Sequence, residues 1–282
     1  MEFKTGHRFR FLLLGLIGLT VLIAGFANWR AQAAALPQVD AKAAVLLDPA
    51  TGKVLFAKNP DTAMAPASTT KIMTAILAIE RGGLSQTIRV SPNAVGIDGS
   101  SMALASGERL RMEDLLYGLM LVSGNDAAVA IADAIAGSEA EFARLMTAKA
   151  RKIGLTNTNY KNPNGLPALN HYSTARDLAK LTAYAMRNSI FARIVATKVK
   201  TIPGSKPGET VTLYNHNKLL WRYPYTTGVK TGYTLTAGGC LVAAAKKDGA
   251  TLISVVLKSN AIYDDSIKLF DYGFKQKSGS RS

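Results

Sequence analysis

The apolar and polar positions of this 282-residue chain follow three patterns. An unbroken apolar run covers residues 11–27. Apolar residues then recur at helical spacing in residues 68–81 and 112–188, and short strand-like runs come before and after these stretches. The chain therefore predicts an apolar terminal segment followed by a structure that mixes helices and strands.

Strand-like runs come from both ends of the chain. Residues 43–47 and 53–57 flank a turn composition at residues 48–52, which predicts a hairpin. Asp248-Gly249 predicts a tight turn between the last two strands. The strands predicted after the helical region cover residues 194–202, 209–214, 225–233, 239–246 and 251–257.

The helical stretches lie between these strands. A helix from Ser68 to about Arg81 should stop at Gly82-Gly83, and a final amphipathic helix should cover about residues 264–274. Strands from both ends of the chain, a helical region between them and a closing helix together imply one mainly antiparallel sheet covered by helices. The predicted class is therefore α+β: an antiparallel five-stranded sheet flanked by helices, with an inserted all-helical lobe at about residues 112–190.

The first 33 residues resemble an export signal. Basic residues precede the apolar run, and Ala31-Gln32-Ala33 offers a cleavage site. An uncleaved membrane anchor is the alternative, because Trp29-Arg30 is typical of a membrane boundary. We expect the protein outside the cytoplasmic membrane: in the periplasm, on the membrane's outer face or cell wall, or secreted.

Charge and cysteine content restrict the partners. The formal net charge is +15, and it falls to +12 when residues 1–33 are removed. Anionic membrane surfaces or acidic wall polymers fit this charge, whereas nucleic acid binding would need a dense basic cluster that the sequence lacks. Cys240 is the only cysteine, so no intramolecular disulfide forms, and no histidine or cysteine has a partner at metal-ligand spacing.

A Ser-x-x-Lys motif at Ser68 and Lys71 carries the candidate chemistry. Three residues of helix place the hydroxyl and the amine on one face, close enough for the amine to take the hydroxyl proton. A serine needs such a base to become a nucleophile. The three histidines show no Ser/His/Asp pattern, which leaves lysine as the base.

Two further short motifs follow in order along the chain. They are Ser123-Gly124-Asn125 and Lys230-Thr231-Gly232. Tripeptides of this kind recur by chance, and residues 4–6 and 91–93 fit the same patterns. The order of the motifs and their context distinguish the candidate set from these chance matches. Residues 4–6 lie in the predicted export signal, and residues 91–93 follow a strand-like run.

The motifs and their surroundings resemble the serine D-alanyl-D-alanine carboxypeptidases, the low-molecular-mass penicillin-binding proteins. The segments that carry the resemblance are residues 67–74, 123–128, 171–178 and 228–234, and the resemblance extends from about Ala44 to Phe274. It implies the penicillin-binding protein and serine β-lactamase-like transpeptidase fold. It also implies a catalytic domain, which we expect over residues 34–278. Many larger carboxypeptidases of this kind carry a β-rich second domain after it, but only eight residues follow Phe274 here, so we expect no such domain.

The resemblance assigns roles to eight residues. It implies a catalytic group of Ser68, Lys71 and Ser123, and a substrate-binding group of Asn125, Lys230, Thr231, Gly232 and Tyr233. The implied oxyanion hole consists of the backbone amides of Ser68 and Tyr233. The implied partners are peptidoglycan stem peptides and covalently bound β-lactams, with neither cofactor nor metal.

Three other functions remain to be weighed. A class A β-lactamase would need a glutamate between the second and third motifs, but residues 142–208 contain none. A D,D-endopeptidase that cuts cross-links stays open, because Ile262-Tyr263 stand near the position where the family often has a carboxylate-binding arginine. A wall-binding or penicillin-sensing module without activity is disfavoured, since every catalytic position is present.

Overall fold

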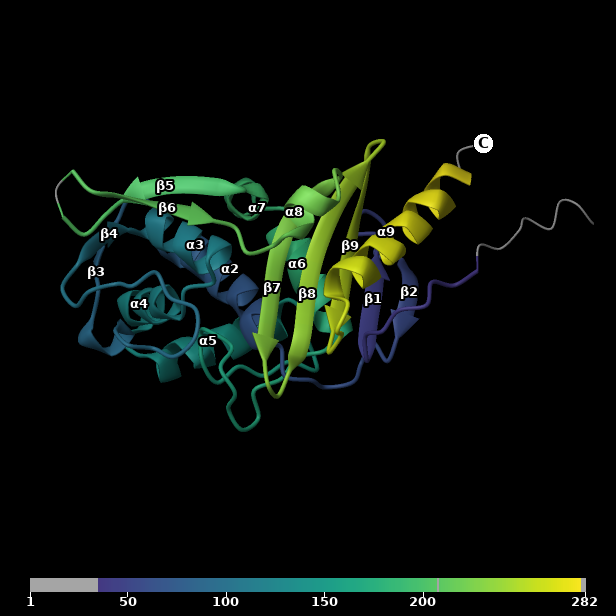
Figure 1. Cartoon of the computed structure of the whole chain (residues 1–282). Helices are drawn as coiled ribbons and strands as arrows, with labels where there is room; N and C mark the ends of the chain where they lie inside the picture. Colours follow the sequence, from purple (N-terminus) through teal and green to yellow (C-terminus); the bar gives the residue numbers. More distant parts are fainter. Residues whose placement is uncertain (1–34, 207, 280–282) are drawn as a thin grey trace, which may run out of the picture. The chain divides into compact units, whose positions relative to one another are not determined.

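A five-stranded antiparallel sheet forms the centre of the fold and confirms the predicted class (Figure 1). The computed structural model describes residues 35–206 and 208–279, so the predicted export signal lies outside the described residues. The strand order is β2-β1-β9-β8-β7. The strands are β1 (Ala43–Leu47), β2 (Val54–Lys58), β7 (Thr226–Thr234), β8 (Gly238–Lys247) and β9 (Ala250–Leu257).

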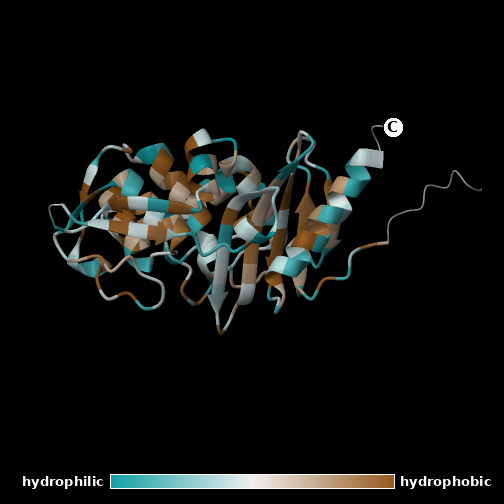
Figure 2. Ribbon diagram, turned by 45° about the horizontal axis from the view of Figure 1, so that its top comes forward, coloured by the Kyte–Doolittle hydropathy of each residue, from teal (hydrophilic) through white to brown (hydrophobic). Residues whose placement is uncertain are grey.

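The two faces of the sheet bury separate cores. The alternation of side chains along β1 shows this directly: Ala43, Val45 and Leu47 belong to one core, while Ala44 and Leu46 belong to the other. Helix α9 (Ile262–Gly279) contacts β8 and β9 on the second core's face, and α6 (Ala175–Ala185) contacts β1 and β9 on the first (Figure 1). Brown apolar ribbon is prominent both in the strands of the sheet and in the helices beside it (Figure 2).

Five further helices pack on one another beside α6, whereas the short helix α8 (Leu219–Arg222) contacts β7. Their mutual contacts join most of them to the first core. Residues 153–174 within the expected helical stretch form turns and loops instead of helix. The helices are α2 (Lys71–Arg81), α3 (Met112–Leu121), α4 (Asn125–Ala136), α5 (Glu139–Lys152) and α7 (Ser189–Ala196). Two small hairpins also form, β3 (Thr87–Arg89) with β4 (Arg109–Arg111) and β5 (Val199–Pro203) with β6 (Thr210–Tyr214).

The expected strand over residues 194–202 is wrong in its first part. Residues 194–196 end α7, and β5 begins only at Val199. The Asn188 side chain caps α7 by accepting hydrogen bonds from the backbone of Ile190 and Phe191. Because Phe191, Ile194 and Val195 then share one buried helix face, packing favours the helix over the strand tendency of these β-branched and aromatic residues.

None of the helices in the described residues is long and apolar enough to cross a membrane.

Candidate active site

Ser68 and Lys71 lie together where a tight turn enters a helix. Ser68 belongs to the 3₁₀ turn η1 (Ala67–Thr70), and α2 begins at Lys71, so the predicted α-helical start at Ser68 is three residues too early. Thr69 donates two hydrogen bonds to the Pro66 carbonyl, from its amide and from its hydroxyl, and Ala67 has a φ of 46°. This strained turn exposes part of Ser68 while Lys71 is fully buried.

The Lys71 amine has three oxygen partners. Its Nζ lies 3.0 Å from Ser68 Oγ, 2.6 Å from Asn125 Oδ1 and 2.6 Å from the Asn164 carbonyl oxygen. Burial holds the pKa of Lys71 well below its ordinary value, the charge of Lys230 lowers it further, and Asp126 acts in the opposite direction. The structure thus brings the predicted nucleophile and base together and favours a neutral amine.

The second motif lies between α3 and α4. Asn125 receives Lys71 on its Oδ1, while its Nδ2 donates to the Asp98 carbonyl 2.5 Å away and its amide to the Ser100 carbonyl 2.7 Å away. Ser123 is buried with a φ of 64°, and among the described residues it makes no hydrogen bond to Ser68 or Lys71. The structure therefore joins the Asn125 side chain directly to the candidate base Lys71, whereas Ser123 has no direct hydrogen bond to it.

The segment before the second motif is held in place by Asp126. The Asp126 carboxylate accepts hydrogen bonds from the amides of Met102 and Leu104, with Oδ2 to N distances of 2.8 and 3.2 Å, and from Ser101 Oγ. Since Asp126 follows Asn125 directly, these bonds fix residues 98–104 against the start of α4. Because this segment contains the carbonyls of Asp98 and Ser100, it also positions the side chain and the backbone amide of Asn125, which donate to them.

The third motif lies on β7, which is an edge strand because it pairs only with β8 among the described strands. A Cβ built on Gly232 would lie 2.9 Å from the Ser68 amide nitrogen, so β7 passes directly beside the nucleophile. Lys230 is buried, its Nζ donates to the Thr231 carbonyl at 3.1 Å, and burial lowers its pKa to about 7. Thr231 is half-buried and Tyr233 is 67% exposed.

The loop of residues 159–173 contributes a part of the site that the sequence motifs do not show. Its Asn164 carbonyl accepts from Lys71, and a Cβ on Gly165, which has a φ of 91°, would lie 1.9 Å from the Ala67 carbonyl oxygen. A backbone acceptor carries no residue signature. Only the turn composition of residues 162–165 marks the segment in the sequence.

His171 joins this loop to the catalytic turn. The Lys161 amide donates to its Nδ1 at 3.0 Å, so Nε2 carries the hydrogen and donates to Thr70 Oγ1 at 2.9 Å. Burial lowers the pKa of His171 to about 4, and the ring stays neutral. A structural role therefore fits His171. Burial and the charge of Lys230 also lower the pKa of His216.

Arg176 and Asp177 do not pair with each other, although their adjacency suggests a helix-stabilising ion pair. Arg176 pairs with Asp61, Nε to Oδ1 at 2.7 Å. The Asp177 carboxylate instead accepts from the Asn157 amide and the Thr158 hydroxyl, both at 2.8 Å. Both residues therefore fix loops to the start of α6.

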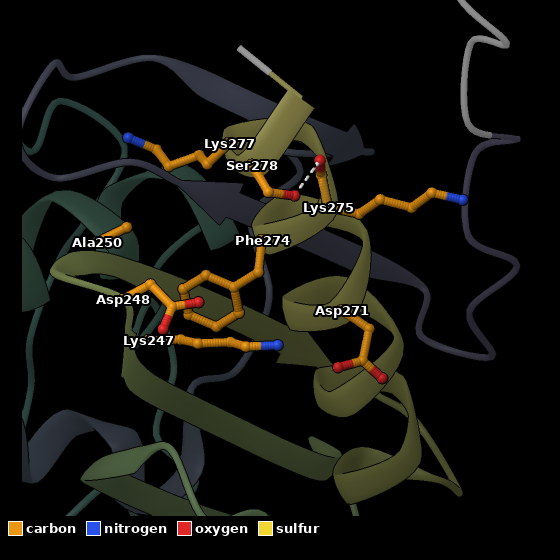
Figure 3. Close-up of a pocket in the computed structure, with 8 residues that line it drawn as sticks. All are labelled: Lys247, Asp248, Ala250, Asp271, Phe274, Lys275, Lys277 and Ser278. Atoms are coloured by element: carbon orange, nitrogen blue, oxygen red, sulfur yellow. Dashed lines mark hydrogen bonds between the residues drawn. The ribbon is translucent and has the colours of Figure 1, made fainter. Parts of the chain in front are cut away.

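A separate cavity of about 460 Å³ lies between the β8–β9 turn and the end of α9 (Figure 3). Lys247 extends from the hairpin toward Asp271, which accepts a hydrogen bond from the Tyr223 hydroxyl at 2.8 Å. None of the eight predicted site residues lines this cavity. Among the described residues no group of histidine, cysteine and acidic side chains forms a metal site, and Cys240 is buried.

Comparisons with known proteins agree with this geometry. A family model described as D-alanyl-D-alanine carboxypeptidase matches residues 30–261. The carboxypeptidase DacF of Bacillus subtilis is 37% identical over 273 residues, which cover 94% of this chain and 70% of that protein. DacC of Escherichia coli is 39% identical over 259 residues, covering 86% and 64%, so this chain spans about two thirds of these two relatives.

Solved structures give the same result. A Streptomyces DD-transpeptidase has a TM-score of 0.80 and 35% identity, with 85% of this chain and 98% of that chain covered. A D-alanyl-D-alanine carboxypeptidase from Mycobacterium tuberculosis has a TM-score of 0.82 and 31% identity, with 87% and 95% covered. The resemblance seen in the motifs is confirmed: this chain belongs to the family of the D-alanyl-D-alanine carboxypeptidases, which are serine peptidases.

Proposed function

We propose that this protein is a serine D,D-carboxypeptidase that removes the terminal D-alanine from peptidoglycan stem pentapeptides through an ester on Ser68. One observation carries the proposal: the buried Lys71 amine lies 3.0 Å from Ser68 Oγ. That distance is within the range over which a general base takes a proton. β-Lactams should acylate the same hydroxyl.

The contacts of Lys71 suit a neutral amine. Such an amine has two N–H donors and one lone pair, and it has two acceptors besides Ser68, namely Asn125 Oδ1 and the Asn164 carbonyl. When both N–H bonds point to these oxygens, the lone pair faces Ser68 Oγ. Ser68 can then donate its proton to Lys71 while its oxygen attacks the carbonyl carbon of the penultimate D-alanine.

The other motifs supply charge stabilisation and a proton route. The amides of Ser68 and Tyr233 would donate to the oxyanion, which fits the close approach of Gly232 to the Ser68 nitrogen. Ser123 would pass the proton to the leaving amine, and Lys230 with Thr231 would bind the terminal carboxylate. A bound carboxylate would stabilise the charged form of Lys230, whose pKa burial lowers to about 7.

The test uses a pentapeptide that ends in D-Ala-D-Ala. We expect free D-alanine and a tetrapeptide, while the Ser68→Ala variant should release neither. Mass spectrometry with penicillin should find one stable adduct on Ser68 in the parent protein. Rapid turnover of penicillin without an adduct would indicate a β-lactamase, and wall binding without any product would indicate a module that lacks activity.

A D,D-endopeptidase is the second candidate. Ile262 and Tyr263 lie at the start of α9, near the position where the family often has a carboxylate-binding arginine. Without a cation there, the selection for a substrate with a free terminal carboxylate is weaker. Cross-linked peptide dimers separate the two activities. Cleavage of dimers without release of D-alanine from the pentapeptide would favour the endopeptidase.

The proposal includes export, because stem peptides lie outside the cytoplasmic membrane. The basic and apolar pattern of residues 1–33 supports it. N-terminal sequencing of the protein recovered from outside the cytoplasm should begin at Ala34. Contact with anionic lipids or acidic wall polymers fits the charge of +12 and should weaken as salt concentration rises.

A further inference from the structure

The hydroxyl of Thr74, on the first turn of α2, holds the loop of residues 159–173. Thr74 is fully buried, and its Oγ1 donates to the Pro163 carbonyl at 2.6 Å. A threonine inside a helix can bond the carbonyl four residues earlier, as Thr182 of α6 does with Leu178 at 2.7 Å. Thr74 does not use that local acceptor, so its hydroxyl connects α2 to the loop instead.

The next peptide unit of the loop carries an acceptor for Lys71. Its carbonyl, from Asn164, accepts from Lys71 Nζ at 2.6 Å. Its amide, from Gly165, donates to Asn162 Oδ1 at 2.8 Å, and Asn162 Nδ2 in turn donates to the Leu166 carbonyl at 2.8 Å. A trans peptide is planar with C=O and N–H on opposite sides, so the bond to Asn162 directs the carbonyl toward Lys71.

The glycine in this peptide unit makes its orientation depend on those contacts. Gly165 has a φ of 91°, and glycine adopts positive and negative φ about equally well. The backbone itself therefore offers little resistance to a rotation of the Asn164–Gly165 peptide plane by half a turn. Such a rotation would remove the carbonyl from Lys71 and present an N–H group to it. Thr74 and Asn162 oppose this rotation by fixing the two sides of the peptide unit.

The orientation of this peptide decides whether Lys71 accepts from Ser68 or donates to it. With Asn125 Oδ1 and the Asn164 carbonyl in place, both N–H groups of a neutral amine are used and its lone pair faces Ser68. With only the Asn125 acceptor left, the second N–H turns to Ser68 Oγ, which lies 3.0 Å away. An amine that donates to the nucleophile cannot take its proton at the same time.

We propose that Thr74 and Asn162 are positioning residues for the acylation of Ser68, because they hold the Asn164–Gly165 peptide with its carbonyl toward Lys71 and so keep the lone pair of the base on the nucleophile. The proposal rests on the proposed function, in which Lys71 is the base. In the described part of the chain neither side chain bonds to Ser68 or Lys71, so both act through the backbone of the loop.

Three variants and a matched control test these roles. Thr74→Val removes the hydroxyl and keeps the shape of the side chain, whereas Thr74→Ser keeps the hydroxyl. Asn162→Ala releases the Gly165 amide without a change in α2. Thr182→Val is the control, because it removes an equally buried threonine hydroxyl whose bond stays inside α6. The measurements are the acylation rate with penicillin as a function of pH, D-alanine release from the pentapeptide, and thermal melting.

Acylation should slow about tenfold in both Thr74→Val and Asn162→Ala, as the loss of one hydrogen bond that orients a general base predicts. Thr74→Ser should acylate within about twofold of the parent rate, since it retains the donor. Thr182→Val should melt at a lower temperature, as Thr74→Val does, yet acylate at the parent rate.

The pH profile distinguishes positioning from a loss of structure. Burial already lowers the pKa of Lys71, and an ammonium that also loses an acceptor is less stable still. The acid limb of the acylation rate should therefore move to lower pH in Thr74→Val and Asn162→Ala, although the maximal rate is smaller. Lys230 and Asp126, whose charges act on Lys71, are unchanged in both variants, so neither accounts for the displacement.

Acylation of Thr74→Val and Asn162→Ala at the parent rate, or slower acylation with an acid limb that does not move, would overturn the positioning role and leave the proposed function intact. An equal loss of rate in Thr182→Val would also overturn it. If Thr74→Val does not fold, Asn162→Ala provides the same comparison.

The proposed function fails separately from the positioning role. If the parent releases no D-alanine but penicillin acylates Ser68, the carboxypeptidase is refuted and the positioning role is still judged by the acylation rates. If penicillin does not acylate the parent, Lys71 does not act as the base and both proposals are overturned.

Discussion

Replacing Gly232 with alanine tests whether β7 and the nucleophile form one site. The added Cβ would lie 2.9 Å from the Ser68 nitrogen and 3.2 Å from the Thr69 nitrogen. Both neighbours are backbone atoms of η1, which cannot rotate away as a side chain can. Ordinary contacts of this kind begin at 3.4 Å, so β7 and η1 must separate by about half an ångström.

That displacement acts on the proposed oxyanion hole. Its donors must lie about 3 Å from the developing charge, and removing one donor costs ~10² to 10³ in kcat. A displacement of half an ångström weakens both donors without removing either, so we expect acylation to slow by about 10- to 100-fold. The barrier then rises by roughly 1.4 to 2.8 kcal/mol.

The assay is the rate of labelling by a fluorescent penicillin, with thermal melting as a check on folding. Gly83→Ala is the control, because a Cβ there meets only the Gln86 Cβ at 3.8 Å and the residue does not need a positive φ. We expect the control to label at the parent rate. Labelling of Gly232→Ala within twofold of the parent, at an unchanged melting temperature, would refute the placement of β7 in the oxyanion hole.

Three further predictions concern buried groups. Lys71→Met should melt as a folded protein yet show no penicillin labelling, because no amine then faces Ser68 Oγ; labelling at the parent rate would contradict the proposed base. Folding lowers the pKa of His171 from 6.5 to about 4, so between these two pH values the unfolded chain binds a proton that the folded protein does not. The free energy of unfolding should therefore decrease as the pH falls from 6.5 to about 4. Thermal melts at these two pH values should show a smaller decrease in stability for His171→Gln than for the parent protein. Burial raises the pKa of the Cys240 thiol to about 11, so maleimide should modify it only after denaturation, and fast labelling of the native protein would count against this.

The sequence alone predicted the elements in which a local pattern and tertiary packing agree. The hairpin of residues 43–57, the β8–β9 turn at Asp248-Gly249 and the final helix all form near their predicted positions. The pairing of Ser68 with Lys71 was equally predictable, since three residues of helical or 3₁₀ turn bring both side chains to one side. Each of these features depends on residues close together in the chain.

Features that depend on distant residues could not be predicted in this way. The Asn164 carbonyl reaches Lys71 across 93 positions, and it is a backbone atom that any residue could supply. Arg176 pairs with Asp61, 115 positions away, in preference to its neighbour. Ala67 takes a positive φ although alanine has no preference for it, because the surrounding loops determine the turn.

The position of β1 within the sheet has a consequence for folding. Ala43–Leu47 pair with residues 253–257, which are synthesised some two hundred residues later, so half of the pairing of β1 waits for the last part of the chain. Such high contact order makes folding slow, because a long loop must close before the pairing contributes any stability. Until β9 arrives, β1 and β2 are an isolated hairpin, which has marginal stability in water. A chain released before residue 250 should therefore lack a closed sheet and be open to proteolysis at its N-terminal strands.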